Sequence, residues 1–279
     1  MSDSDRRREQ IAVPPAPTPD TRELPQRRTC LVLDAEIDAL DFGAAQDRLL
    51  AWGRQRDSRY VVLANAHVVV AAGQDAAFAR AVNNADMATA DGAPVAWMMR
   101  KLGYAGQQRV CGPDLMWAML GRCAHEDLTV YLYGGSPATL QALTQRLERE
   151  FPALKLAGAE SPPFRALSPE EDNETVQRIN GSGARLVFVG LGCPKQEVWM
   201  ATHRGKIRAV LIGVGAAFDY HAGTLTRAPR WMRDNGLEWL YRLIAEPRRL
   251  WKRYLVTNTL FILGAIRQLR GSGDRNRNP

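Results

Sequence analysis

Short apolar runs rich in β-branched residues alternate with longer amphipathic stretches along most of the chain. The runs cover residues 29–34, 60–66, 86–92, 128–135, 154–159, 185–192 and 209–219. Between them, apolar residues recur at the three- and four-residue spacing of helices. Strands that are apolar on both sides are buried on both faces, so this alternation predicts βαβ units around a mostly parallel sheet. The expected fold class is therefore α/β.

The alternation stops after residue 225, where a basic and aromatic segment begins. Within it, GLEWLYRLIAEPRRLWKRYL covers residues 236–255. Pro247 predicts two helices here, because a proline ends or kinks the helix before it. At about 100° per residue, Arg249 and Arg253 share one face of the second helix, with Lys252 beside them.

These changes divide the chain into four segments. We expect a disordered leader over residues 1–28, an α/β core over residues 29–225, a basic helical appendage over residues 226–270 and a disordered tail over residues 271–279. The leader is charged and rich in proline, and it lacks the apolar stretch of a signal peptide.

The net charge of +7 is concentrated in the last quarter of the chain. Up to Leu225 there are 25 lysines and arginines against 26 acidic residues, and from Thr226 onward there are 12 against 4. The appendage therefore suits an anionic partner, which is a lipid surface, a phosphate-bearing substrate or nucleic acid. No nucleic-acid-binding motif accompanies the charge, so nucleic acid is the weakest of these three hypotheses.

Several classes of site lack their sequence signal. The four cysteines form no C-x-x-C pair, the four histidines have no metal-ligand spacing, and no G-x-S-x-G motif is present. We therefore expect no metal, no cofactor and a reducing compartment. The longest apolar run, residues 255–266, is shorter than the roughly 20 residues of a spanning helix.

Two glycine-containing loops follow predicted strands, at the edge where ligands bind in such sheets. In YLYGGSP, Gly134 and Gly135 precede a helix start that is suited to a nucleotide or phosphate, although the same residues also suit a plain tight turn. In GLGCPKQE, Gly192 is followed by Lys195, Gln196 and Glu197 in a first helical turn. Either these side chains recognise a base or sugar, or they form a solvated turn on a capped helix.

Acidic and basic side chains also follow these strands. Asp91 in TADG either caps the next helix or acts as a general base where substrates gather. Arg109 and Asp114 in RVCGPDL are substrate-binding candidates, and Asp114 also suits a helix cap. Asp219, in the loop after the last strand, is a further substrate-binding candidate.

The helices after Pro247 have two interpretations. An amphipathic helix usually packs on the core with its charged face outward. Tryptophan and tyrosine flanked by arginine are also what a helix in a membrane interface needs. Ten basic residues against three acidic ones between residues 227 and 270 favour a role that faces an anion.

The chain resembles the WecG/TagA/CpsF glycosyltransferases, also called glycosyltransferase family 26, over residues from about 30 to 270. The motifs that carry the resemblance are LANAHVVV, ADG, RVCGPDL, YLYGG, GLGCPKQE, GVGAAFDYHAG and RAPRWMRDNGLEWLYRLIAEPRRLWKRY. The resemblance implies a Rossmann-like core with a C-terminal appendage that associates with the membrane and helps to close the site.

The resemblance also implies an activity: inverting, metal-independent transfer from a UDP-sugar to a monosaccharide on a polyprenyl diphosphate. It implies that Asp91 is the general base and that Asn65, Arg109 and Gln196 line the pocket. The appendage arginines implied to bind the donor diphosphate are Arg242, Arg249 and Arg253. A peripheral location at the cytoplasmic face of the inner membrane and homo-oligomers formed through the core are implied as well.

One residue departs from the family pattern. Leu63 stands where family members often carry threonine, two residues before Asn65, and this removes a hydroxyl from the pocket. UDP-glucose, UDP-N-acetylmannosamine and its uronic acid therefore all stay open as donors. The rival hypothesis is a membrane scaffold that binds a nucleotide sugar and performs no chemistry.

Overall fold

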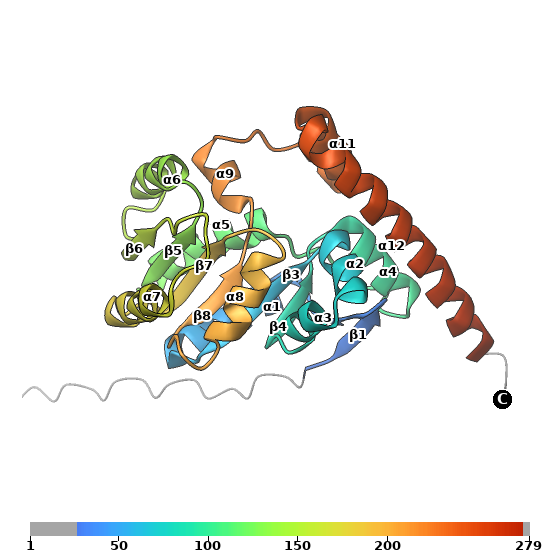
Figure 1. The fold of residues 1–279 in the computed structure, drawn as a ribbon, viewed down its shortest axis with the longest axis horizontal. Helices are drawn as coiled ribbons and strands as arrows, with labels where there is room; N and C mark the ends of the chain where they lie inside the picture. The colour runs from blue at the N-terminus through green and yellow to red at the C-terminus, as the bar shows by residue number, and fades with distance from the viewer. Residues whose placement is uncertain (1–26, 276–279) are drawn as a thin grey trace, which may run out of the picture.

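The computed structural model describes residues 27–275, with side chains as far as residue 271. Residues 1–26 of the expected leader therefore lie outside the described residues. Six parallel strands form the main sheet in the order β4-β3-β8-β7-β5-β6 (Figure 1). Their bounds are β3 Arg59–Ala64, β4 Met87–Ala90, β5 Val130–Gly134, β6 Leu156–Glu160, β7 Leu186–Gly190 and β8 Val210–Gly213. The α/β fold with a parallel sheet is confirmed.

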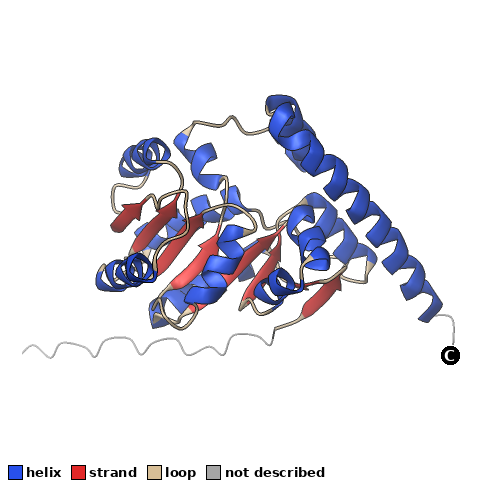
Figure 2. Ribbon diagram, viewed as in Figure 1, coloured by secondary structure: helices blue, strands red, loops and turns tan. Residues whose placement is uncertain are grey.

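Helices lie on both sides of this sheet (Figure 2). The core helices are α1 Phe42–Gln55, α2 Ala66–Gln74, α3 Ala76–Asn83, α4 Ala93–Lys101, α5 Gly112–His125, α6 Pro137–Glu150, α7 Pro169–Gly181, α8 Lys195–His203 and α9 Ala217–Ala222. Side chains alternate along β3: Val62 belongs to the apolar cluster that includes residues of α2, α3 and α8, whereas Val61 belongs to the cluster that includes residues of α1 and α5. Two apolar clusters therefore enclose the sheet, which explains the apolar runs in the sequence.

The first apolar run differs from its expected place. Residues 29–34 do not enter the parallel sheet, because β1 Thr29–Val32 turns back at Leu33 and pairs antiparallel with β2 Ala35–Asp38. Arg27 donates from Nε to the buried carboxylate of Asp38 over 3.0 Å, so ordered contacts begin before residue 29.

The helical stretch between the apolar runs 60–66 and 86–92 forms two helices, α2 and α3. The side chain of Asp75 accepts hydrogen bonds from the backbone N–H groups of Ala77 and Phe78, and it therefore caps α3 immediately after α2. An aspartate inside a helical pattern is the sequence signal for such a break.

The appendage consists of α10 Arg230–Asp234, α11 Glu238–Ala245 and α12 Pro247–Arg275. The predicted division at Pro247 is confirmed, since α11 ends two residues before it. Helix α12 extends to Arg275, five residues into the segment expected as a disordered tail, and residues 276–279 lie outside the described residues. In Figure 1, α12 runs diagonally along the side of the core near α2 and α4.

Two polar side chains of α12, Thr257 and Gln268, fix the helix to the core. Thr257 is buried, and its Oγ1 lies 3.3 Å from Nδ1 of His67 on α2. Further along, Gln268 Nε2 donates to the carbonyl oxygen of Leu31 over 2.7 Å, and its Oε1 accepts from the backbone N–H of Leu33 over 2.8 Å. The helix is thereby held against the core at two positions about three turns apart.

The outer face of α12 is apolar. Its exposed apolar side chains are Trp251, Leu255, Val256, Leu260, Ile262, Leu263 and Ile266. Within residues 27–275, none of the helices combines the length and the apolarity needed to span a bilayer.

Gly134 provides a test of the sheet packing. Its φ is +120°, and a Cβ there would lie 2.6 Å from the backbone carbonyl of Gly190 on β7. Gly134→Ala should therefore lower the free energy of unfolding by about 2–4 kcal/mol through backbone strain and overpacking. Gly181→Ala is the control, because a Cβ there meets open space. Equal urea unfolding midpoints for the two variants would refute the close approach of β5 and β7.

Candidate functional site

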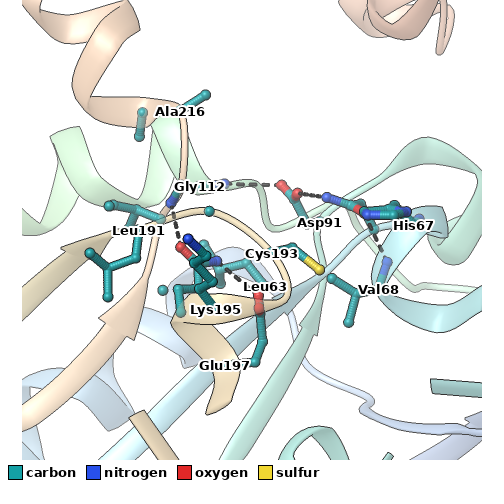
Figure 3. A pocket seen from close by; sticks show the side chains of 18 of the residues that line it. Leu63, His67, Val68, Asp91, Gly112, Leu191, Cys193, Lys195, Glu197 and Ala216 are labelled. Carbon is teal, nitrogen blue, oxygen red and sulfur yellow. Dashed lines mark hydrogen bonds between the residues drawn. The ribbon is translucent and has the colours of Figure 1, made fainter. Parts of the chain in front are cut away.

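A cavity of about 1500 Å³ lies between the carboxyl ends of the strands and the appendage. The strands end level with one another, since Ala64 pairs with Ala90 and Gly134 pairs with Gly190. The loops that follow them therefore meet at one edge, and Figure 3 shows their side chains around the cavity. This is the edge at which the sequence predicts a site.

Asp91 follows β4 and lies at the base of this cavity (Figure 3). Its Oδ1 accepts a 3.0 Å hydrogen bond from the backbone N–H of Gly112, and its own N–H donates to the carbonyl oxygen of Ala64. The residue that caps α4 is Gly92, so Asp91 does not serve as that cap. Burial raises the pKa of Asp91 to about 6, although Gly112 and Arg109 oppose this effect. At neutral pH the group is an ionised carboxylate that binds a proton readily.

Asn65 holds the second carboxylate oxygen. Its Nδ2 donates to Oδ2 of Asp91 over 3.4 Å, and its Oδ1 accepts from the backbone N–H groups of His67 and Val68. The same side chain thus caps α2 and orients Asp91. Leu63, two residues earlier, also lines the cavity.

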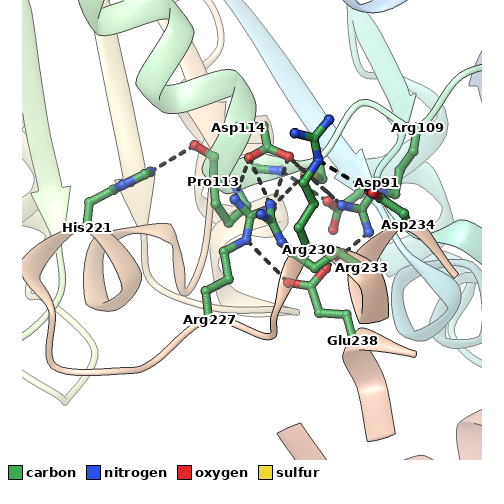
Figure 4. A network of polar contacts seen from close by, with 12 residues as sticks. Asp91, Arg109, Pro113, Asp114, His221, Arg227, Arg230, Arg233, Asp234 and Glu238 are labelled. Atoms are coloured by element: carbon green, nitrogen blue, oxygen red, sulfur yellow. Dashed lines mark hydrogen bonds and ion pairs between the residues drawn. The ribbon is translucent and has the colours of Figure 1, made fainter. Parts of the chain in front are cut away.

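Arg109 and Asp114 belong to a network of charges that joins the core to the appendage (Figure 4). Arg109 Nη1 donates to Oε2 of Glu238 over 3.1 Å. Both terminal nitrogens of Arg227 donate to Asp114, and the bond from Nη2 to Oδ2 is 2.9 Å long. Nη1 of Arg233 lies 3.7 Å from Oδ1 of Asp114. Asp114 is therefore an anchor for the appendage outside the cavity lining, and its contact with substrate stays a prediction.

The contacts of Asp114 with Arg227 and Cys111 lower the pKa of its carboxyl group. Burial alone would raise its pKa, but hydrogen bonds from Arg227 and Cys111 outweigh this effect and hold the pKa at about 2. A lowered carboxyl pKa stabilises the folded state above the ordinary value near pH 4, and this contribution is lost as the pH falls through about 2.

Of the three glycines predicted to bind substrate, Gly134 packs within the sheet, whereas Gly135 and Gly192 line the cavity. Gly134 packs against the backbone of Gly190 and lies outside the cavity lining. Gly135 lines the cavity, yet its N–H already donates to the carbonyl oxygen of Gly190 over 3.0 Å. Gly192 lines the cavity at a φ of +76°, which is a turn conformation that suits glycine.

Three predicted site residues, Lys195, Gln196 and Glu197, lie in the first turn of α8 and differ in burial. Lys195 is exposed at the rim. Gln196 is buried, accepts from the backbone N–H of Gly215 over 3.1 Å and donates to Glu197 over 2.9 Å. Glu197 is fully buried, and burial raises the pKa of its carboxyl. Gln196 thus holds the loop after β8 through the N–H of Gly215, and Glu197 orients Gln196.

Asp219, on α9, lines the far side of the cavity. Its Oδ1 accepts from the hydroxyls of Thr139 at 3.1 Å and Thr224 at 3.3 Å. This aspartate therefore connects the start of α6 to the loop that leads into the appendage.

The three predicted appendage arginines all line the cavity. Arg249 is exposed and pairs with Glu246 over 2.6 Å. Arg242 and Arg253 are partly buried and form no ion pair within residues 27–275, and the Nε of each is buried without a hydrogen-bond partner. Arg242 lies over the ring of Tyr220, 6.0 Å from its centroid. Two guanidinium groups are thus available to an anion in the cavity.

Three charged residues of the site were not predicted, namely Arg227, Arg233 and Glu238. Their signal in the sequence is the charged stretch RAPRWMRDNGLE, in which Glu238 is one of few acids in a basic segment. Their partners lie more than 110 residues earlier, so no local pattern identifies the pairing.

Comparison with known families places this geometry in context. Residues 30–275 match the glycosyl transferase WecG/TagA/CpsF family, which is nearly the whole described chain. The chain belongs to the WecG/TagA/CpsF glycosyltransferase family. It is therefore a glycosyltransferase of cell-surface polysaccharide synthesis, and the family implies a nucleotide-sugar donor and an acceptor. The resemblance inferred from the motifs is confirmed.

Among the residues that the structure describes, no three histidine, cysteine or acidic side chains are grouped closely enough to hold a metal ion.

The contact between Asn65 and Asp91 yields a prediction. Asn65→Asp keeps a capping oxygen for α2 but replaces the amide donor with a second carboxylate beside Asp91. The pKa of Asp91 should rise from about 6 by about one unit or more, as observed by carboxyl-carbon NMR titration. Asp75→Asn, an exchange at the cap of α3, should leave it unchanged. An unshifted titration in the Asn65 variant would contradict the contact.

Proposed function

We propose that this family member is an inverting, metal-independent transferase that moves a hexose from a UDP-sugar to a polyprenyl-diphosphate-linked monosaccharide. The observation that carries the proposal is the placement of Asp91 in one cavity with the guanidinium groups of Arg242 and Arg253. The first is a base, and the other two are cations without an anionic partner among the described residues. These are the two kinds of group that a single displacement needs.

The carboxylate of Asp91 takes the proton from an acceptor hydroxyl as its oxygen attacks the anomeric carbon. The bond from that carbon to the UDP oxygen breaks in the same step, so the configuration at the carbon inverts. The pKa of about 6 leaves most of Asp91 ionised at neutral pH and still basic enough to accept the proton. Asn65 and the N–H of Gly112 orient the two oxygens of Asp91.

The departing UDP gains negative charge as the bond breaks. Arg242 and Arg253 lie in a partly desolvated wall of the cavity, where opposite charges attract more strongly than in water. We assign them to the donor diphosphate, with the exposed Arg249 as a third cation at the rim. Lys195, Gly192 and Asp219 border the remaining donor volume.

The acceptor lipid would reach the site from a membrane. Exposed apolar side chains of α12 and its tryptophan and arginine residues suit an anionic lipid surface. The proposal therefore places the protein peripherally at the cytoplasmic face of the inner membrane. Closing the cavity at that surface limits donor hydrolysis by water.

Leu63 makes the cavity apolar at the position where the resemblance implies a threonine, and it leaves the donor sugar open. UDP-glucose, UDP-N-acetylmannosamine and its uronic acid are the three donors to compare. Acceptor-dependent UDP release in bilayer nanodiscs with one of the three would name the sugar.

Replacing the base tests the mechanism. Asp91→Asn should lower the transfer rate by about 10²–10⁴-fold with donor binding kept, because the amide cannot accept the proton. The wild-type rate should rise with pH through an apparent pKa of about 6. Asp47→Asn, an exposed aspartate outside the cavity, is the matched control. Unchanged UDP release from the Asp91 variant would support the scaffold hypothesis instead.

Neutralising the cations tests the leaving-group assignment. Arg242→Ala and Arg253→Ala should each lower kcat by about 10–10³-fold, because charge on the departing diphosphate is then left unmatched. Arg248→Ala removes the same charge from an exposed α12 residue outside the cavity lining and should change the rate by less than about threefold. Equal effects of all three substitutions would indicate attraction to anionic lipid alone.

A further inference from the structure

Glu238 is an acid that the proposed chemistry does not use. It lies in the first turn of α11, lines the cavity and points toward Arg109 and Arg227 (Figure 4). Its Oε2 is 3.1 Å from Arg109 Nη1, and its Oε1 is 3.6 Å from Arg227 Nε. An appendage carboxylate thus enters a cavity whose other appendage charges are cations.

The position of Glu238 matters because of Arg109, which lies beside Asp91 in the network (Figure 4). A cation next to a carboxylate weakens that carboxylate as a base, because it favours the ionised form. The charged groups that act on Asp91 are Arg109 and Glu238, and they have opposite effects on it. The other groups facing Asp91 are neutral: the amide of Asn65, the N–H of Gly112 and the thiol of Cys111.

We propose that Glu238 is a positioning residue that keeps Asp91 basic by holding and neutralising Arg109 when the appendage is docked. The inference rests on the proposed role of Asp91 as the base. The appendage then has two roles, because its arginines serve the leaving group and its one carboxylate in the cavity serves the base. Arg109 also lies 3.9 Å from Asp114 of the core, so a core without a docked appendage would share Arg109 between Asp114 and Asp91, and the share on Asp91 would weaken the base.

The test is a carboxyl-carbon NMR titration of Asp91 in the full chain, assigned with Asp91→Asn. Glu238→Gln should lower the pKa of Asp91 from about 6 by about half a unit or more. Glu238→Asp keeps the charge and should restore most of the shift. Asp234→Asn removes the same charge from an exposed appendage residue paired with Arg230 and should have no effect. An unshifted pKa in Glu238→Gln would overturn the proposal.

Loss of docking would also lower the pKa, because Asp91 would become hydrated, so a second variant with the opposite sign is needed. Arg109→Gln should raise the pKa of Asp91 above its wild-type value, since Glu238 would then act on it unopposed. A value at or below that of the wild type would overturn the proposal.

The acid limb of the transfer rate should follow the same order of variants. The titration requires no turnover, so a protein inactive with every donor would defeat the proposed function while the titration still decides the role of Glu238.

Discussion

The ion pairs around Asp114 are the constraint on which the site depends. Asp114 belongs to the core, whereas Arg227 and Arg233 belong to the first residues of the appendage. Half-buried charges are costly unless they are paired, so these groups strongly favour one arrangement of the two parts. Arg242 and Arg253 line the cavity on α11 and α12, the two helices that follow this anchor along the chain. The contacts of Thr257 and Gln268 then hold α12 along its length.

The docked arrangement separates charge within one cavity. Asp91 lies at the strand edge, where burial keeps it basic, and the two unpaired guanidinium groups lie on the appendage wall. In the proposed reaction a base and a leaving-group cation must both be present without neutralising one another, and here they are carried by different elements. In the proposed mechanism Glu238 serves the same separation, because it pairs with Arg109, the cation that acts on Asp91.

Local patterns predicted the fold and the strand-edge residues, since apolar periodicity and strand ends are properties of neighbouring residues. The hairpin of β1 and β2 was missed because its two strands have only four residues each, too few to distinguish an antiparallel turn from one longer strand. The role of Asp114 was missed for another reason: its partner Arg227 lies 113 residues away. Gln196 and Glu197 were predicted as pocket residues from a polar first turn, but only the fold shows that both are buried.

We propose that the pairing of Asp114 with Arg227 joins the core and the appendage into one active site. A double-mutant cycle on acceptor-dependent UDP release in nanodiscs tests it most directly, using Asp114→Asn, Arg227→Gln and the combined variant. Each single variant should lose most of the transfer rate, and the combined variant should lose no more, because either change breaks the same anchor. Full rates in both single variants, or losses that multiply in the combination, would contradict it.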